Sequence, residues 1–178
     1  MDFMYELKIP RERIAVLIGK KGEIKKEIEQ QTKAKIFIDS EEGFVRLSGN
    51  DGLSLFTCKE IVKAIARGFN PEIARLLFRT DYTLVMINVE AYTSKSRKSM
   101  QRLRGRVIGS DGKSRKTIEQ LTETYISVYG KTIGIIGETA HVEVAKAAVE
   151  DLLNGAMHAS TYRWLEKKQK DIAIKERF

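Results

Sequence analysis

The sequence predicts an α+β protein in which one β-α-α-β-β-α unit occurs twice and is followed by a C-terminal helix. Three observations lead to this fold class. The segment IGKKGEIKKEIEQQTKAKIFID, which starts at Ile18, aligns without a gap with IGSDGKSRKTIEQLTETYISVY, which starts at Ile108. Apolar residues alternate in some segments, as in strands, and recur every three or four residues in others, as in helices. A chain of 178 residues that is 42% hydrophobic can form one large or two small domains with a packed core.

The two segments share identical residues at a constant offset. The identical pairs include Ile18 and Ile108, the two glycines of each loop, Ile28 and Ile118, Glu29 and Glu119, Gln30 and Gln120, Thr32 and Thr122, and Ile36 and Ile126. Chance rarely aligns so many identities without a gap, so the chain contains an internal repeat.

Alternating residues predict that the first unit opens with a strand over residues 5–9, which Pro10 ends. Ile24 and Ile28 lie four residues apart, as on one face of a helix. The further elements expected in this unit are helices over residues 11–18 and 23–32, strands over 35–39 and 44–47, and a longer helix over 53–68.

The second unit repeats this order. The elements expected are a strand over residues 83–89, helices over 101–108 and 113–123, a hairpin of strands over 125–129 and 132–136, and a helix over 140–154. Asn70-Pro71 predicts a helix start between the units. The predicted division is a first domain over residues 1–69, a connector over 70–82, a second domain over 83–155 and a helical extension over 156–178.

A C-terminal helix is expected over residues 157–175. Trp164 and Leu165 are the residues expected to pack it onto the second unit. The Lys167-Lys168-Gln169-Lys170 run is interpreted as a solvated face of this helix, not as a binding site.

Composition favours an anionic partner and argues against several other classes. The formal net charge is +8, which suits nucleic acid, although a basic surface that serves only solubility remains an alternative. Cys58 is the only cysteine, and His141 and His158 are far apart in the sequence, so we expect no disulfide, no metal site and no cofactor. No segment has the apolar length of a signal peptide or a membrane span. A cytoplasmic protein is expected.

The loop between the two short helices of each unit has the pattern I-G-x-x-G. Glycine at both ends lets the backbone turn sharply and lets a phosphate approach without a Cβ in the way. The next helix starts directly after the loop, so its N–H groups and the positive end of its dipole face the same anion. A lone glycine pair would more often be a plain turn between helices. Two copies in matched frames favour a binding function.

This pattern is similar to that of the type I KH domain, and the similarity extends over nearly the whole chain. It implies that each loop holds the backbone of about four nucleotides of single-stranded RNA while their bases lie in an adjacent groove. In the first unit the RNA-binding residues expected are Gly19, Lys20, Lys21 and Gly22 of the loop, with Lys25 and Lys26 after it. Lys25 and Arg115 stand where KH domains commonly have an apolar residue.

The second loop, Gly109-Ser110-Asp111-Gly112, departs from the first because Asp111 places a negative charge where phosphate would lie. Either this loop binds RNA weakly, or the surrounding cations compensate. The cations are Lys95, Arg97, Lys98, Arg102, Arg104, Arg106, Lys113, Arg115 and Lys116, and Ser114 lies among them. We expect this stretch to contact RNA.

Apolar residues beside each loop fit two roles. Ile14, Ile36 and Ile38 in the first unit, and Val107, Ile126 and Val128 in the second, could line the groove or fill the core, because strand alternation permits both.

No motif in the sequence supports an enzymatic function. Gly112-Lys113-Ser114 matches the end of a phosphate-binding P-loop, but that motif needs glycine where Val107 stands. No catalytic triad order, paired-carboxylate motif or zinc-protease helix is present. We therefore expect a protein that is not an enzyme.

A narrower resemblance rests on the second unit. The run from Arg106 to Glu119, the segment TETYISV from Thr122 to Val128, and the basic insertion over residues 91–102 resemble the archaeal Dim-two family of small-ribosomal-subunit processing factors. This resemblance implies binding to the 3′ region of small-subunit ribosomal RNA. It also implies protein partners, namely the Nob endonuclease and a translation initiation factor subunit. An alternative remains open, in which the second unit is a docking surface for a protein.

Overall fold

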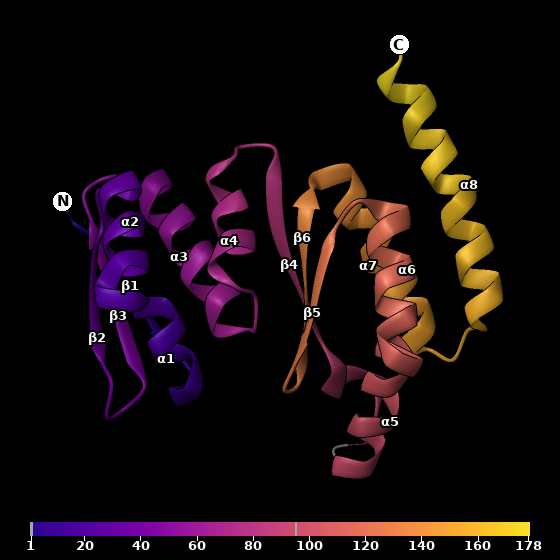
Figure 1. The fold of residues 1–178 in the computed structure, drawn as a ribbon, viewed down its shortest axis with the longest axis horizontal. Coiled ribbons are helices and arrows are strands. Elements are labelled where there is room, and N and C mark those ends of the chain that lie inside the picture. Colours follow the sequence, from indigo (N-terminus) through magenta and orange to yellow (C-terminus); the bar gives the residue numbers. More distant parts are fainter. Residues whose placement is uncertain (1, 95) are drawn as a thin grey trace. The chain divides into compact units, whose positions relative to one another are not determined.

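The computed structural model describes residues 2–94 and 96–178, so Lys95 lies outside the described part of the chain. The chain divides into two compact units, Met1–Thr80 and Asp81–Phe178. Each has its own three-stranded antiparallel sheet with helices packed against one face (Figure 1). The α+β fold of two KH-like units and a C-terminal helix is confirmed, and the predicted connector over residues 70–82 falls mostly within the first unit.

The first unit has its sheet in the order β1-β3-β2. Its elements are β1 (Phe3–Lys8), α1 (Arg11–Ile18), the 3₁₀ turn η1 (Lys20–Gly22), α2 (Glu23–Thr32), β2 (Lys35–Asp39), β3 (Phe44–Gly49) and α3 (Gly52–Ala66). A short helix, α4 (Pro71–Ala74), and the 3₁₀ turn η2 (Arg75–Phe78) then pack against α3. Alternate strand residues such as Val45 and Leu47 are buried, as are Leu17 and Ile61 of the helices.

The second unit repeats this arrangement, with the sheet order β4-β6-β5. Its elements are β4 (Tyr82–Asn88), η3 (Val89–Tyr92), α5 (Arg97–Ile108), η4 (Ser110–Gly112), α6 (Lys113–Thr122), β5 (Tyr125–Tyr129), β6 (Thr132–Glu138), α7 (Thr139–Leu153) and α8 (His158–Glu176). Ile118, Ile133 and Leu152 bring α6, the sheet and α7 together in its core.

One helix start differs from the sequence-based expectation. Helix α5 begins at Arg97, although residues 101–108 were predicted, so the basic insertion is not a plain loop. Ser96 caps this helix, because its hydroxyl oxygen accepts a hydrogen bond from the Ser99 backbone N–H over 3.2 Å. The other predicted helices and strands begin and end within about two residues of those observed.

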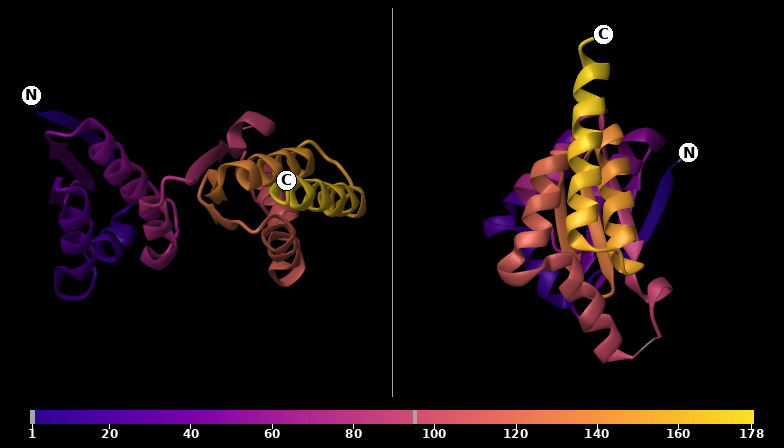
Figure 2. Two further views of the ribbon diagram at one scale, coloured as in Figure 1. Left: turned by 90° about the horizontal axis from the view of Figure 1, so that it is seen from above. Right: turned by 90° about the vertical axis from the view of Figure 1, so that its right-hand side faces the viewer.

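Helix α8 lies along α6 and α7 on the side away from the sheet (Figures 1 and 2). Leu165 is fully buried in the core of the second unit, and Trp164 packs against the same core, as predicted. None of the described helices is both long enough and apolar enough to cross a membrane.

Candidate nucleic-acid interface

The two glycine loops have the same backbone conformation. Gly19 and Gly109 both have φ of 74°, with ψ of 177° and 175°. At the second glycine, φ is 76° for Gly22 and 75° for Gly112. These dihedral angles lie in regions that residues with a Cβ rarely adopt. The sequence repeat is therefore a repeat of local geometry.

The two glycines of a loop serve different purposes. A Cβ added to Gly19 would lie 2.4 Å from Ile24 Cγ1, and one added to Gly109 would lie 2.7 Å from the Ser114 backbone nitrogen. The first glycine is therefore needed for close packing against the next helix. A Cβ on Gly22 would meet nothing nearer than Lys26 Cε at 3.8 Å. Only the second glycine leaves open space for a phosphate.

The helix after each loop starts without a side-chain cap. Gly22 and Gly112 occupy the N-cap positions of α2 and α6, and neither has a side-chain oxygen to accept from the first-turn N–H groups. These N–H groups and the positive helix end are suited to bind an anion. The set of cations around them differs between the two units.

Most of the cations predicted to bind RNA are exposed, some at these helix starts and others along α5. In the first unit these are Lys20, Lys21 and Lys26, and in the second they are Arg97, Lys98, Arg102, Lys113 and Lys116. Arg97 and Lys98 lie in the first turn of α5, which holds no acidic residue. A cation at a helix N-terminus costs about 0.3–1 kcal/mol. A bound polyanion would offset this cost.

Lys25 and Arg115 are half-buried, and each is paired with an acid of its own helix. Lys25 Nζ lies 3.6 Å from Glu29, and an Arg115 guanidinium nitrogen lies 3.6 Å from Glu119. Arg115 also donates to the Ile126 carbonyl oxygen over 3.3 Å. These two positions therefore present a polar pair where an apolar residue is common in KH domains.

Two arginines predicted to contact RNA are constrained by the fold. Arg106 donates from Nε to the Leu152 carbonyl oxygen over 2.9 Å and from a terminal nitrogen to the Ala156 carbonyl oxygen, so it holds the end of α7. Arg104 is half-buried, and its Nε is buried with no hydrogen-bond partner among the described residues. Neither side chain is a freely exposed cation.

The apolar candidates for the groove are mostly core residues. Ile14 and Ile36 are 5% and 3% exposed, so both offer a base little surface. Val107 and Ile126 are buried in the same way in the second unit. Ile38 and Val128 are half-buried and keep some surface beside the loops.

The repeated glutamates have a structural role that the sequence did not reveal. Glu29 Oε2 accepts a hydrogen bond from the Ile36 N–H over 3.1 Å, and Glu119 Oε2 accepts one from the Ile126 N–H over 2.9 Å. Each glutamate thus ties the helix after the loop to the strand that follows it. This tether fixes the wall against which the RNA bases are expected to lie.

Comparisons with known proteins assign both units to the same kind of domain. Residues 4–64 match the KH domain family, and residues 83–170 match the family described as the eukaryotic-type KH domain, or KH-domain type I.

Relatives match over nearly the full chain. A KH domain-containing protein of Methanocaldococcus jannaschii is 50% identical over 170 residues, which cover 93% of this chain and 74% of that protein. The RNA-binding protein pno1 of Dictyostelium discoideum is 31% identical over 175 residues, which cover 96% of this chain and 72% of that protein. A chain in the crystal structure of the a/eIF2alpha–aDim2p–rRNA complex from Pyrococcus horikoshii is 45% identical, with a TM-score of 0.88 and 96% of each chain covered.

The chain belongs to the Dim2/PNO1 family of KH-domain proteins. As a member of this family it is a KH-domain RNA-binding protein, and its homologues are RNA-binding and pre-rRNA-processing proteins. The resemblance stated from the second unit is confirmed.

A cavity lies beside the second loop of this Dim2/PNO1 protein, and the sequence did not predict it. It has a volume of about 440 Å³ and is lined by Arg102, Gly105, Arg106, Gly109, Ser110, Lys113, Ser114, His158 and Tyr162. His158 and Tyr162 come from α8, far from the loop in the sequence. No local pattern could have placed them there.

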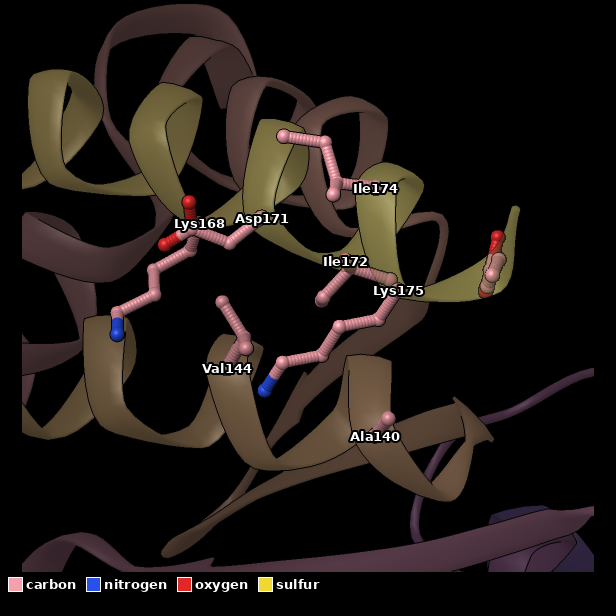
Figure 3. Close-up of a pocket in the computed structure, with 8 residues that line it drawn as sticks. Ala140, Val144, Lys168, Asp171, Ile172, Ile174 and Lys175 are labelled. Atoms are coloured by element: carbon pink, nitrogen blue, oxygen red, sulfur yellow. The ribbon is translucent and has the colours of Figure 1, made fainter. Parts of the chain in front are cut away.

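A second pocket, of about 590 Å³, lies between α7 and the C-terminal half of α8 (Figure 3). Lys168 and Lys175 reach from α8 toward α7, where Ala140 and Val144 form an apolar floor (Figure 3). Nothing in the described residues indicates a ligand for it.

A possible metal-ligand group in this family member involves only one of the histidines. Glu138, His141 and Glu176 bring their ligand atoms within 4.8 Å of one another. The distance in sequence between the two histidines gave no indication of these carboxylates, because only the fold brings them to His141. His141 already has partners, because Nδ1 lies 2.9 Å from the Thr122 carbonyl oxygen and Nε2 lies 3.2 Å from Glu176 Oε1.

Proposed function

We propose that this protein binds the 3′ region of small-subunit ribosomal RNA, as a single strand, during ribosome assembly. The observation that carries the proposal is the pair of loops with one backbone conformation, each followed by an uncapped helix start among exposed cations. The rRNA in the Pyrococcus horikoshii complex supports ribosomal RNA as the ligand. The 3′ region follows from the Dim-two resemblance.

In this proposal each loop binds phosphates and each neighbouring groove binds bases. The open space at Gly22 and Gly112 lets the RNA backbone approach the N–H groups of the helix start. The Lys25–Glu29 and Arg115–Glu119 pairs then offer donors and acceptors to the edges of the bases. Hydrogen bonds to base edges would give sequence selectivity that phosphate contacts alone do not give.

A second candidate function is protein docking by the second unit. Asp111 favours it, because this exposed acid lies at the tip of the second loop. The Pyrococcus horikoshii complex contains a/eIF2alpha as well as rRNA. We therefore propose a translation initiation factor subunit as one protein partner, and the processing endonuclease implied by the Dim-two resemblance as another. Cytoplasmic localisation stays a prediction.

The test is binding of the purified chain to a single-stranded oligonucleotide from the 3′ end of small-subunit ribosomal RNA. A scrambled RNA of equal length and composition is the control. Tight binding to the first RNA only, lost in the Lys20→Asp/Lys21→Asp variant, supports the proposal. Equal binding to both RNAs leaves a general RNA-binding protein, and binding to neither contradicts the proposal.

Asp111→Lys separates RNA binding from docking in the second unit. Lys21 already adopts the same left-handed conformation in the first loop, so lysine fits the backbone at this position. If the second loop binds RNA, this change raises RNA affinity. If the loop docks a protein, the change leaves RNA affinity as it was and weakens binding to the initiation factor subunit or the endonuclease.

A further inference from the structure

The cavity beside the second loop is built from four elements. Helix α5, the loop turn η4 and the start of α6 form one side, and the first turns of α8 close the other. Gly109 and Ser110 of the loop lie on its wall. A strand held at the loop can therefore continue directly into this cavity.

A buried hydroxyl in the cavity has no partner. Ser114 is 1% exposed, lines the cavity, and its Oγ finds no hydrogen-bond partner among the described residues. A buried hydroxyl without a partner is costly, and native proteins rarely keep one. Ser114 is the second residue of α6, so it lies where the first-turn N–H groups attract an anion.

The charge and hydrogen-bonding groups of the cavity suit a phosphate. Arg102, Arg106 and Lys113 line it, and none of the described lining residues is acidic. His158 Nε2 lies 2.8 Å from the Arg106 carbonyl oxygen, which can only accept, so Nε2 donates this bond. Tyr162, next to His158 with ring centroids 6.1 Å apart, adds a phenol. Cationic and hydroxyl donors of this kind recognise phosphate.

We propose that this cavity binds a phosphodiester group of the RNA strand, at a nucleotide that flanks those held by the second loop. The proposal rests on the proposed RNA-binding function. Ser114, Arg102 and Lys113 contact the phosphate, and His158 and Tyr162 of the C-terminal helix contact the adjoining nucleotide. Helix α8 is then part of the RNA-binding surface of the second unit.

Ser114→Ala gives the sharpest test. Binding is measured for an RNA of about four nucleotides, which fills only the loop and groove, and for one extended by about two nucleotides at each end. We expect Ser114→Ala to bind the extended RNA about tenfold more weakly and the short RNA unchanged. Its thermal stability should be equal or higher, because the unpartnered hydroxyl is gone.

Thr161→Val is the matched control. Thr161 is 3% exposed, its Oγ1 also lacks a partner among the described residues, and it lies on α8 outside the cavity. Its replacement should leave both RNA affinities unchanged. Tyr162→Ala should weaken binding of the extended RNA only, whereas Lys167→Ala, on the exposed face of α8, should not.

Each outcome decides the proposal. If the wild type binds the short RNA and Ser114→Ala binds the extended RNA equally well, the cavity is not an RNA subsite, while the proposed function stands. If inorganic phosphate binds the wild type but not Ser114→Ala, and RNA binding is unaffected, the cavity is a free-phosphate site and the proposal is overturned. If the wild type binds neither RNA, both the proposed function and this inference fail.

Discussion

The middle of each loop holds one residue with a side chain in left-handed backbone. Lys21 and Asp111 both have φ of 54°. Aspartate is enriched in this conformation, and lysine is not. The left-handed backbone conformation therefore favours aspartate at position 111, independently of any effect on RNA binding. Lys21 adopts the same conformation in the first loop, where its side chain adds a positive charge.

Alanine at the two glycines of the first loop should separate stability from binding. Gly19→Ala should lower the free energy of unfolding by about 2–4 kcal/mol, because its Cβ would overlap Ile24 and its φ is positive. Gly22→Ala adds only the conformational strain, about 1–2 kcal/mol, but places a methyl group where the phosphate approaches. Chemical denaturation and RNA titration of both variants measure this. Equal stability losses, or unchanged RNA affinity in Gly22→Ala, would contradict the assigned roles.

Arginines of one helix can have different roles, because some of them donate hydrogen bonds to carbonyl oxygens at the end of another helix. Arg106 supports the end of α7, and Arg13 does the same for α3 by donating to the Ile65 and Phe69 carbonyl oxygens over 2.8 and 2.7 Å. The two arginines occupy different positions of the repeat, yet they satisfy equivalent carbonyl groups. Each unit therefore needs one arginine of its first helix for the fold.

Arg106→Gln and Arg102→Gln form a matched pair on one helix. Arg106→Gln should cost about 2–4 kcal/mol of stability, because two carbonyl groups lose a charged donor. Arg102 is exposed, so Arg102→Gln should change stability by less than about 0.5 kcal/mol. It should weaken RNA binding and reduce its salt dependence. Thermal denaturation with RNA titration distinguishes the two, and the reverse pattern would refute the assignment.

Helix α8 should be held more firmly at low pH. Burial lowers the pKa of His141, but the hydrogen bonds to Glu176 and the Thr122 carbonyl and the charges of Glu123 and Glu138 outweigh it, so the pKa is raised above 6.5. A raised pKa means that the protonated form stabilises the fold. This contribution is complete below pH 6.5 and is lost as the pH rises through the raised value.

Amide hydrogen exchange of α8 between about pH 5 and pH 8, corrected for intrinsic exchange, measures this effect. Protection should fall with rising pH in the wild type and change little with pH in His141→Gln. Glu176→Gln should weaken the dependence because the main favourable partner loses its charge. A His141→Gln variant with the full wild-type pH dependence would show that another group is responsible.

Local patterns in the sequence were enough to predict the repeat, the loops and the packing of α8 by Leu165. They could not show that Arg106 supports the fold while Arg102 is exposed. Both are cations of one basic helix, and only the contacts of Arg106 with the distant end of α7 distinguish them. The same holds for His158, whose place beside the second loop depends on how α8 packs. The early start of α5 had a visible signal in Ser96, because serine is a favoured N-cap residue.

The two units share a frame but differ in the surfaces around their loops. The first loop carries two lysines, whereas the second carries an acid and has a cavity beside it that includes residues of α8. Each unit has a core of its own, so each loop can be altered without unfolding the other unit. In the proposed function, the covalent link between them would let one RNA strand bind both units at a raised effective concentration.

Loss of one loop should therefore affect long and short RNAs differently. An RNA long enough to reach both loops should bind the wild type about 10²- to 10⁴-fold more tightly than an RNA of about four nucleotides. Lys20→Asp/Lys21→Asp should remove most of this advantage, because only the second loop remains. It should also reduce the slope of log affinity against log salt by about 1.4, since each lost phosphate contact on a single strand contributes about 0.7.

Lys167→Ala/Lys170→Ala, which removes two exposed cations of α8, is the control and should preserve the advantage. If the double aspartate variant keeps the full preference for the long RNA, the two loops do not share one strand, and the docking function of one unit gains support.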